Sequence, residues 1–142
     1  MKLFFREYPA VQPAEQSQTI VILHGLFGSS DNWLTQARIL SNNHFKVYTV
    51  DLANHGQSPH SDNFDYPSMV NDLDEFLSDQ NIVNPVLLGH SMGGKTAMNF
   101  ALAHPDKLSK LIVVDISPRY YDLEHYTIVQ GLNAMNIDTS SE

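Results

Sequence analysis

The chain has 142 residues, 42% of them hydrophobic and 17% charged, and 16 acidic against 8 basic residues give a net charge of −8. This is the composition of one globular domain, and its acidity argues against nucleic acid or an anionic membrane as a partner. The absence of cysteine excludes disulfides, thiolate metal sites and a cysteine nucleophile. The apolar start of MKLFFREYPA is too short for a signal peptide or a membrane span, so we expect a cytoplasmic protein.

Five apolar runs predict the strands of one sheet. The first, LFFREY, predicts an antiparallel edge strand. The others are continuous rather than alternating in polarity, which is typical of strands buried on both faces. They cover residues 19–23, 46–52, 85–89 and 110–116. We expect the spatial order to be the edge strand, then 46–52, 19–23, 85–89 and 110–116.

Segments with helical spacing of their apolar residues separate these strands. They cover residues 31–40, 66–79 and 92–104, and Pro67 suits the first turn of the second one. Strands that alternate with helices predict an α/β fold with a mostly parallel sheet and helices on both faces. In such a sheet the reactive groups lie at the carboxyl ends of the strands.

The sequence Gly89-His90-Ser91-Met92-Gly93 lies between a predicted buried strand and a predicted helix. It matches G-x-S-x-G, the nucleophile elbow, in which a sharp strained turn projects the serine hydroxyl from the top of the sheet. The flanking glycines allow strand and helix to approach closely. A simple glycine-rich turn is the alternative, but no phosphate-binding P-loop or dinucleotide-binding pattern occurs. We therefore expect Ser91 to be a nucleophile.

A second loop, HGLFG, follows the strand at 19–23. Attack of a serine on an acyl carbonyl creates a negative oxygen, which preorganised backbone N–H groups stabilise. One donor should be the Met92 amide, and the other should be the Leu26 amide, with Phe27 as the alternative. His24 is expected to order this loop through hydrogen bonds rather than to act as the general base.

Four segments together resemble the α/β-hydrolase superfamily: HGLFGSSDNW, DLANHGQSPH, GHSMGGKTAM and VVDISP. They are most similar to the subfamily of YbfF-type esterases and alpha/beta hydrolase domain-containing protein 11, and the resemblance extends to about Tyr121. Ala53 departs from it, because relatives often carry arginine there. The resemblance implies hydrolysis of short acyl esters or thioesters through an acyl-serine intermediate. It also implies an α/β-hydrolase fold truncated after the sixth strand, as that fold's strands are usually counted. We expect neither a cofactor nor a metal.

The resemblance also implies a catalytic acid on the strand at 110–116, where Asp115 stands. A buried carboxylate here would orient an imidazole and stabilise its cation. The alternative is that Asp115 caps a turn before Pro118. Asp51 ends the strand at 46–52, where a turn-forming role is expected instead. Gly25 and His90, like His24, are expected to support the site from its surroundings.

The general base is not identified by the sequence. The histidine of this fold follows the last strand, and beyond Asp115 only His125 occurs. His55 and His60 lie after a strand two places from Ser91, about 10 Å away. His90 should point away across the elbow, and His44 and His104 are expected in surface positions. We interpret residues 1–118 as the amino-terminal part of a hydrolase core and residues 119–142 as the start of a cap or a tail. We expect this 142-residue chain to be inactive alone.

Two other readings remain open. A non-catalytic binding module would keep this fold and use the pocket for a ligand. A cofactor-free perhydrolase or carbon–carbon bond hydrolase would keep the elbow and change the reaction. For the favoured reading, the partner is a small acyl ester or thioester, and the strand at 110–116 is expected to pair with a second copy or with a complementing carboxy-terminal fragment.

Overall fold

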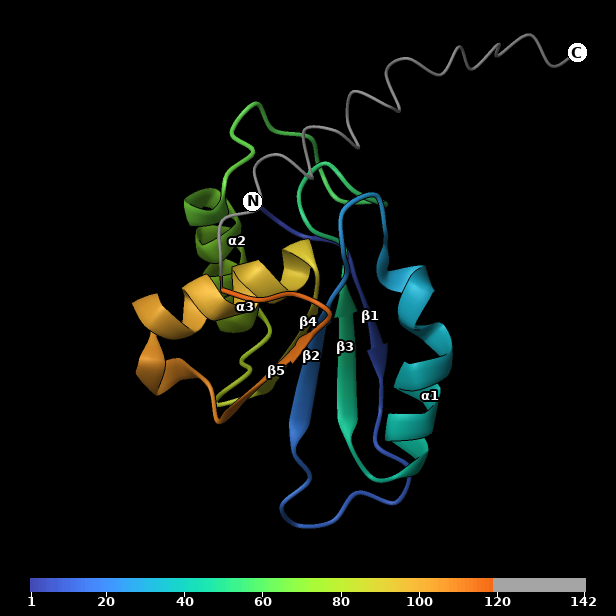
Figure 1. The fold of residues 1–142 in the computed structure, drawn as a ribbon. Coiled ribbons are helices and arrows are strands. Elements are labelled where there is room, and N and C mark those ends of the chain that lie inside the picture. The colour runs from blue at the N-terminus through green and yellow to red at the C-terminus, as the bar shows by residue number, and fades with distance from the viewer. Residues whose placement is uncertain (119–142) are drawn as a thin grey trace, which may run out of the picture.

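The computed structural model describes residues 1–118, and both His125 and the expected cap start or tail at 119–142 lie outside the described residues. The described chain forms a five-stranded sheet in the order β1-β3-β2-β4-β5, with α1 on one face and α2 and α3 on the other (Figure 1). The strands are β1 Phe5–Tyr8, β2 Thr19–Leu23, β3 Lys46–Val50, β4 Val86–His90 and β5 Lys110–Val114.

Strand pairing confirms the order that the sequence predicts. β1 pairs antiparallel with β3, and the pairs β3–β2, β2–β4 and β4–β5 are parallel. The last strand is shorter than predicted because Asp115 has a φ of 54°, which is incompatible with an extended backbone. β3 likewise ends at Val50. The carboxyl ends of β2, β3, β4 and β5 therefore meet at one edge of the sheet.

The three predicted helices are present, with small changes at their ends. A 3₁₀ turn, Ser30–Trp33, precedes α1, Leu34–Asn42, and the Ser29 side chain caps that turn. α2 spans Tyr66–Asp79, and its first turn is capped by the Asp65 carboxylate. α3 is Met92–Ala103, followed by a short 3₁₀ turn at Pro105–Lys107. None of the helices within residues 1–118 combines the length and the apolar composition that a bilayer span requires.

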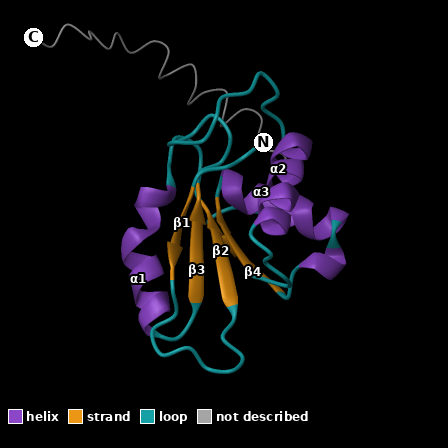
Figure 2. Ribbon diagram, turned by 180° about the vertical axis from the view of Figure 1, so that it is seen from behind, coloured by secondary structure: helices purple, strands orange, loops and turns teal. Residues whose placement is uncertain are grey.

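The sheet separates two apolar clusters of unequal size. On one face, α2 and α3 bury a large cluster that includes Val21, Leu23 and Phe100. The other face is covered by α1 (Figure 2), and a smaller cluster around Ile22 lies there. α1 stands over β1 and β3, so Ile112 of β5 is 43% exposed. The β5 end of the sheet is therefore less covered than the β3 end.

Candidate active site

Each of the four parallel strands is followed by a non-glycine residue with a positive φ. These residues are Phe27 (62°), Asn54 (65°), Ser91 (51°) and Asp115 (54°), after β2, β3, β4 and β5 in turn. A positive φ is unfavourable for residues with a Cβ and persists only where the surrounding structure imposes it. The edge of the sheet at which the sequence predicts the active site thus contains several strained positions.

Ser91 stands at the junction of β4 and α3, with φ 51° and ψ −116°, so the strained elbow predicted from the sequence is present. Its N–H donates to the Val114 carbonyl at 3.1 Å, which ties the elbow to β5. Gly93 in the first turn of α3 lies against β2, where a Cβ would overlap the Leu23 carbonyl oxygen. The glycine therefore lets the helix begin close to the sheet and directly beneath the serine.

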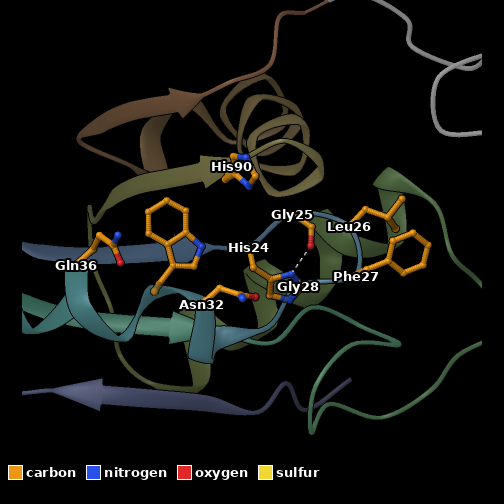
Figure 3. Close-up of a pocket in the computed structure, with 9 residues that line it drawn as sticks. His24, Gly25, Leu26, Phe27, Gly28, Asn32, Gln36 and His90 are labelled. Carbon is orange, nitrogen blue, oxygen red and sulfur yellow. Dashed lines mark hydrogen bonds between the residues drawn. The ribbon is translucent and has the colours of Figure 1, made fainter. Parts of the chain in front are cut away.

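The HGLFG loop lies against this elbow. A Cβ on Gly25 would be 3.3 Å from the Cβ of Ser91. The Gly28 N–H donates to the Gly25 carbonyl at 3.0 Å, which closes the loop into a tight turn (Figure 3). The Phe27 N–H is also used, because it donates to His55 Nε2 at 3.1 Å. Within residues 1–118 the Leu26 N–H makes no hydrogen bond, so of the two predicted alternatives Leu26 has the available donor.

The second expected donor is the Met92 amide. Met92 is the first residue of α3, and the N–H groups of a first helical turn have no acceptor within the helix. They lie at the positive end of the helix dipole, which favours a negative charge. Loop and helix thus each offer one amide close in sequence to a residue of the elbow contact, and backbone amides of this kind are the donors from which oxyanion holes are built.

His24 is completely buried and uses both ring nitrogens. Its Nε2 accepts from the Leu52 N–H at 3.0 Å, so Nδ1 carries the proton and donates to the Gly25 carbonyl at 2.7 Å. Burial lowers the pKa of His24, and the bond to Gly25 opposes this only in part. His24 therefore stays neutral and holds the loop, and neither nitrogen is available to take a proton from Ser91.

His55 completes a pair of imidazoles under the loop. Its ring centre lies 5.0 Å from that of His24, its Nε2 accepts from Phe27, and its Nδ1 donates to the Ala53 carbonyl at 2.9 Å. The sequence indicates that His55 lies too far from Ser91 to be a base, but it does not predict the contact with Phe27. The signal was present, because β3 neighbours β2 and the loops that follow adjacent parallel strands lie together.

Asp51 links three segments. Its carboxylate is 1% exposed and accepts from the Ser30 N–H at 2.6 Å and from the Gln57 N–H at 2.8 Å. Its backbone carbonyl accepts from the Ser58 hydroxyl at 2.5 Å. The expected turn-forming role is thus joined by a contact to the segment after β2, which the sequence alone did not indicate.

Asp115 does not lie in the environment that the sequence analysis assumes. It follows β5, next to the strand of Ser91, but its side chain is exposed. The expectation of a buried carboxylate is therefore wrong for the described chain. The reason is that β5 is the outermost strand within residues 1–118, and no described element covers its end.

His90 points to the α1 side of the sheet, where its ring lies 6.2 Å from that of Trp33. It lines a cavity of about 490 Å³ together with His24, Gly25, Trp33 and Gln36 (Figure 3). Ser91 is not among the lining residues, so this cavity lies beside the elbow rather than over the hydroxyl. Within residues 1–118 no three potential metal ligands cluster.

The remaining described histidines lie elsewhere. His44 and His60 are exposed, and His44 Nδ1 is 2.6 Å from the Val11 carbonyl oxygen. His104 follows α3 and packs against Phe100, with ring centres 5.0 Å apart. These positions agree with the surface and helix-end locations expected from the sequence.

Comparison with known proteins adds a family to this geometry. Residues 18–135 match the family described as alpha/beta hydrolase fold. Esterase YbfF of Escherichia coli is 40% identical over 137 residues, which are 96% of this chain and 53% of that protein. An sn-1-specific diacylglycerol lipase, ABHD11 of Xenopus laevis, is 52% identical over 100 residues, which are 70% of this chain and 32% of the lipase.

Among solved structures, a marine microorganism esterase superposes with a TM-score of 0.83 at 46% identity. The superposition covers 95% of this chain and 52% of the esterase. The chain thus spans between a third and about a half of the length of these relatives.

Proposed function

Because the chain belongs to the α/β-hydrolase fold family, we propose that it is the amino-terminal part of a serine hydrolase that cleaves carboxylic esters or acyl thioesters. The observation that carries this proposal is the backbone of Ser91, with φ 51° and ψ −116° at the start of α3. A serine held in this strained conformation beside an available Leu26 amide has the parts that acyl transfer needs.

The chemistry proceeds in two steps. The Ser91 hydroxyl loses its proton to a base and attacks the carbonyl carbon, and the Leu26 and Met92 amides stabilise the resulting oxyanion. Collapse of this intermediate breaks the bond to the alcohol or thiol, which takes the proton from the base and leaves an acyl-serine. Water then attacks the acyl-serine by the same route and releases the carboxylic acid.

In this proposal the base comes from outside the described residues. His24 and His55 are the imidazoles beneath the HGLFG loop, and all four of their ring nitrogens are engaged in hydrogen bonds. His90 faces Trp33 on the α1 side. We therefore expect the 142-residue chain alone to show little or no turnover. By "full-length protein" we mean this chain together with the carboxy-terminal part that its relatives have.

Asp115 is the proposed acid of the triad. It stands at the end of β5, one strand from Ser91, and a carboxylate there would hold an imidazole between itself and the serine. In this proposal the full-length protein covers Asp115, and the covering segment carries the histidine.

The names of the relatives support ester substrates. One relative is called an esterase and another a diacylglycerol lipase, and both names describe cleavage of a carboxylic ester. A perhydrolase or a carbon–carbon bond hydrolase would use the same elbow, and product analysis with ester, peroxide and diketone substrates separates these reactions. A binding module without catalysis has no need for a strained serine, whose conformation costs on the order of 1–3 kcal/mol.

The test is the Ser91→Ala variant of the full-length protein, assayed with p-nitrophenyl acetate and butyrate. We expect kcat to fall by about 10⁴-fold or more, because only oxyanion stabilisation and binding remain. Ser78→Ala, at an exposed position near the end of α2, is the matched control and should retain wild-type activity. Turnover by Ser91→Ala close to the wild-type rate would end the proposal.

A further inference from the structure

A second cavity, of about 390 Å³, lies between the HGLFG loop and the loop that follows β3. Its walls include Leu26, Phe27, His55 and Phe64. Leu26 and Phe27 point to the same side of the HGLFG loop, away from Gln36 (Figure 3). The two phenylalanine rings are unusually accessible, with Phe27 59% and Phe64 46% exposed. The cavity is thus bordered by two large apolar side chains that each leave about half of their surface exposed.

Phe27 is an unlikely residue for its position on folding grounds alone. A φ of 62° is rare for a bulky side chain, and such strained conformations cost on the order of 1–3 kcal/mol. The exposed ring offsets little of this cost through burial. Residues that combine strain with an exposed apolar side chain occur at ligand-binding sites, because there the ligand supplies the missing contact.

The polar side chains in the wall take part in hydrogen bonds within the protein. Both ring nitrogens of His55 are in hydrogen bonds, and Asn54 Oδ1 accepts from the Ser61 N–H at 2.8 Å. The His55 ring also packs against Phe64, with centres 5.9 Å apart. An occupant would therefore find mainly apolar surface, which selects an apolar group.

The order of the strands decides which part of an ester points here. The leaving group must lie beside the base, which in the proposed mechanism stands between Ser91 and Asp115, toward β5. The acyl group then extends the other way, toward the loops after β2 and β3, where the cavity lies. Leu26 connects the two, because its amide is the proposed oxyanion donor and its side chain lines the cavity.

We propose that this cavity receives the distal part of the acyl chain and selects medium-length acyl groups. The inference rests on the proposed function. The near wall of the cavity is Leu26, after the strand next to β4, and its far wall follows β3, two strands or about 10 Å from β4. An acetyl group is too short to extend to the far wall, whereas an octanoyl chain is long enough. Phe27 and Phe64 are then specificity-determining residues that contact the substrate but take no part in bond breaking.

The test is the ratio of kcat/KM for p-nitrophenyl octanoate to kcat/KM for p-nitrophenyl acetate, measured on the full-length protein. Phe64→Ser should lower this ratio at least about tenfold, because each methylene that loses an apolar contact weakens binding in the transition state. Phe64→Leu, which keeps an apolar wall, should restore most of the ratio. Val83→Ser is the matched control, since Val83 is 80% exposed and lies outside this cavity.

An equal loss for both esters in Phe64→Ser would overturn the inference, because it would mean that Phe64 only packs against the rest of the protein. An unchanged ratio would overturn it as well. A second measurement needs no turnover and uses the 142-residue chain. Sodium octanoate should shift the NMR amide signals of Phe27, His55 and Phe64 in the wild type, and sodium acetate should not. Absence of these shifts would refute the cavity assignment even if the wild-type enzyme hydrolysed no ester, an outcome that would refute the proposed function separately.

Discussion

Two regions at the carboxyl edge of the sheet are held in different ways. After β2 and β3, three buried side chains, His24, Asp51 and His55, fix the loops through hydrogen bonds to backbone groups. At the β5 end, Asp115 is exposed, and within residues 1–118 no strand pairs with the outer edge of β5. The loop that carries the proposed Leu26 donor is therefore held by hydrogen bonds within the described residues, whereas the groups proposed to move protons need a further segment.

The largest effect should come from Asp115, after β5. Asp115→Asn in the full-length protein should lower kcat by about 10⁴-fold, because an amide no longer fixes the histidine tautomer or stabilises its cation. Circular dichroism should show an unchanged fold, and Asp79→Asn at an exposed position is the matched control. Activity near that of the wild type would contradict the assignment of Asp115, since the catalytic acid would then lie on a later strand.

In the loops after β2 and β3, Asp51→Ala should lower the free energy of unfolding of the 142-residue chain by about 3 kcal/mol. The substitution leaves the buried Ser30 amide and the Gln57 amide without their acceptor. Asp51→Asn keeps one acceptor oxygen and should lose less. Urea unfolding measures both variants, with the exposed Asp79→Ala expected within about 0.5 kcal/mol of the wild type. An equally small change for Asp51→Ala would show that its loop contacts contribute no stability.

The free edge of β5 should make the isolated chain associate with a second copy. Within residues 1–118 the strand exposes Leu111 and Ile112, and its outer edge has no partner strand, which favours strand pairing between chains. Ile112→Lys should weaken this association by about tenfold or more, because a charge at the edge opposes pairing. Light scattering over a range of concentrations measures it, and Leu102→Lys on α3 is the control. A wild-type monomer of 16.0 kDa at high concentration would contradict the expectation.

The smallest effect is the pH dependence of the free energy of unfolding that His24 causes. The pKa of His24 is lowered in the folded chain, whereas a histidine in the unfolded chain has a pKa of about 6.5. Below that pH the unfolded chain binds a proton that the folded chain does not, so the free energy of unfolding should fall as pH decreases. The contribution of one group is at most about 1.4 kcal/mol per pH unit.

His24→Asn should remove this part of the pH dependence, and His60→Asn, at an exposed position, should leave it in place. Urea unfolding between pH 7 and the acid limit of the fold measures both slopes. If His24→Asn keeps the wild-type slope, His24 does not stay neutral through burial as described.

The features that sequence predicts well are those encoded in short segments. The G-x-S-x-G elbow needs only adjacent residues, and Ser91 adopts the strained conformation that the pattern predicts. The strands follow from continuous apolar runs, and their order, which is the order expected for the fold that the chain resembles, is confirmed as well. Contacts between loops are harder to predict, because they depend on which loops become neighbours. The bond from Phe27 to His55 spans 28 residues, and the bond from Ser30 to Asp51 spans 21.

The prediction that Asp115 is buried was wrong for a different reason. A position in the sequence can show that a carboxylate ends a strand, but burial depends on every element that packs nearby. At β5 the described chain supplies α3 on one face and no partner strand on the outer edge. Motif and position were therefore sufficient to locate Asp115 beside Ser91 but insufficient to define its surroundings.

The hydrogen bonds of the HGLFG loop have a consequence for evolution and for protein engineering. Phe27 and Gly28 hold the loop through their backbone N–H groups, and the side chains of Leu26 and Phe27 take no part. Side chains at these two positions can therefore be exchanged without removing a bond that shapes the loop. Point mutations at these two positions can therefore change substrate selectivity, provided that His24, Asp51 and His55 are kept. A combinatorial library confined to positions 26, 27 and 64 would sample substrate preference while leaving the catalytic framework intact.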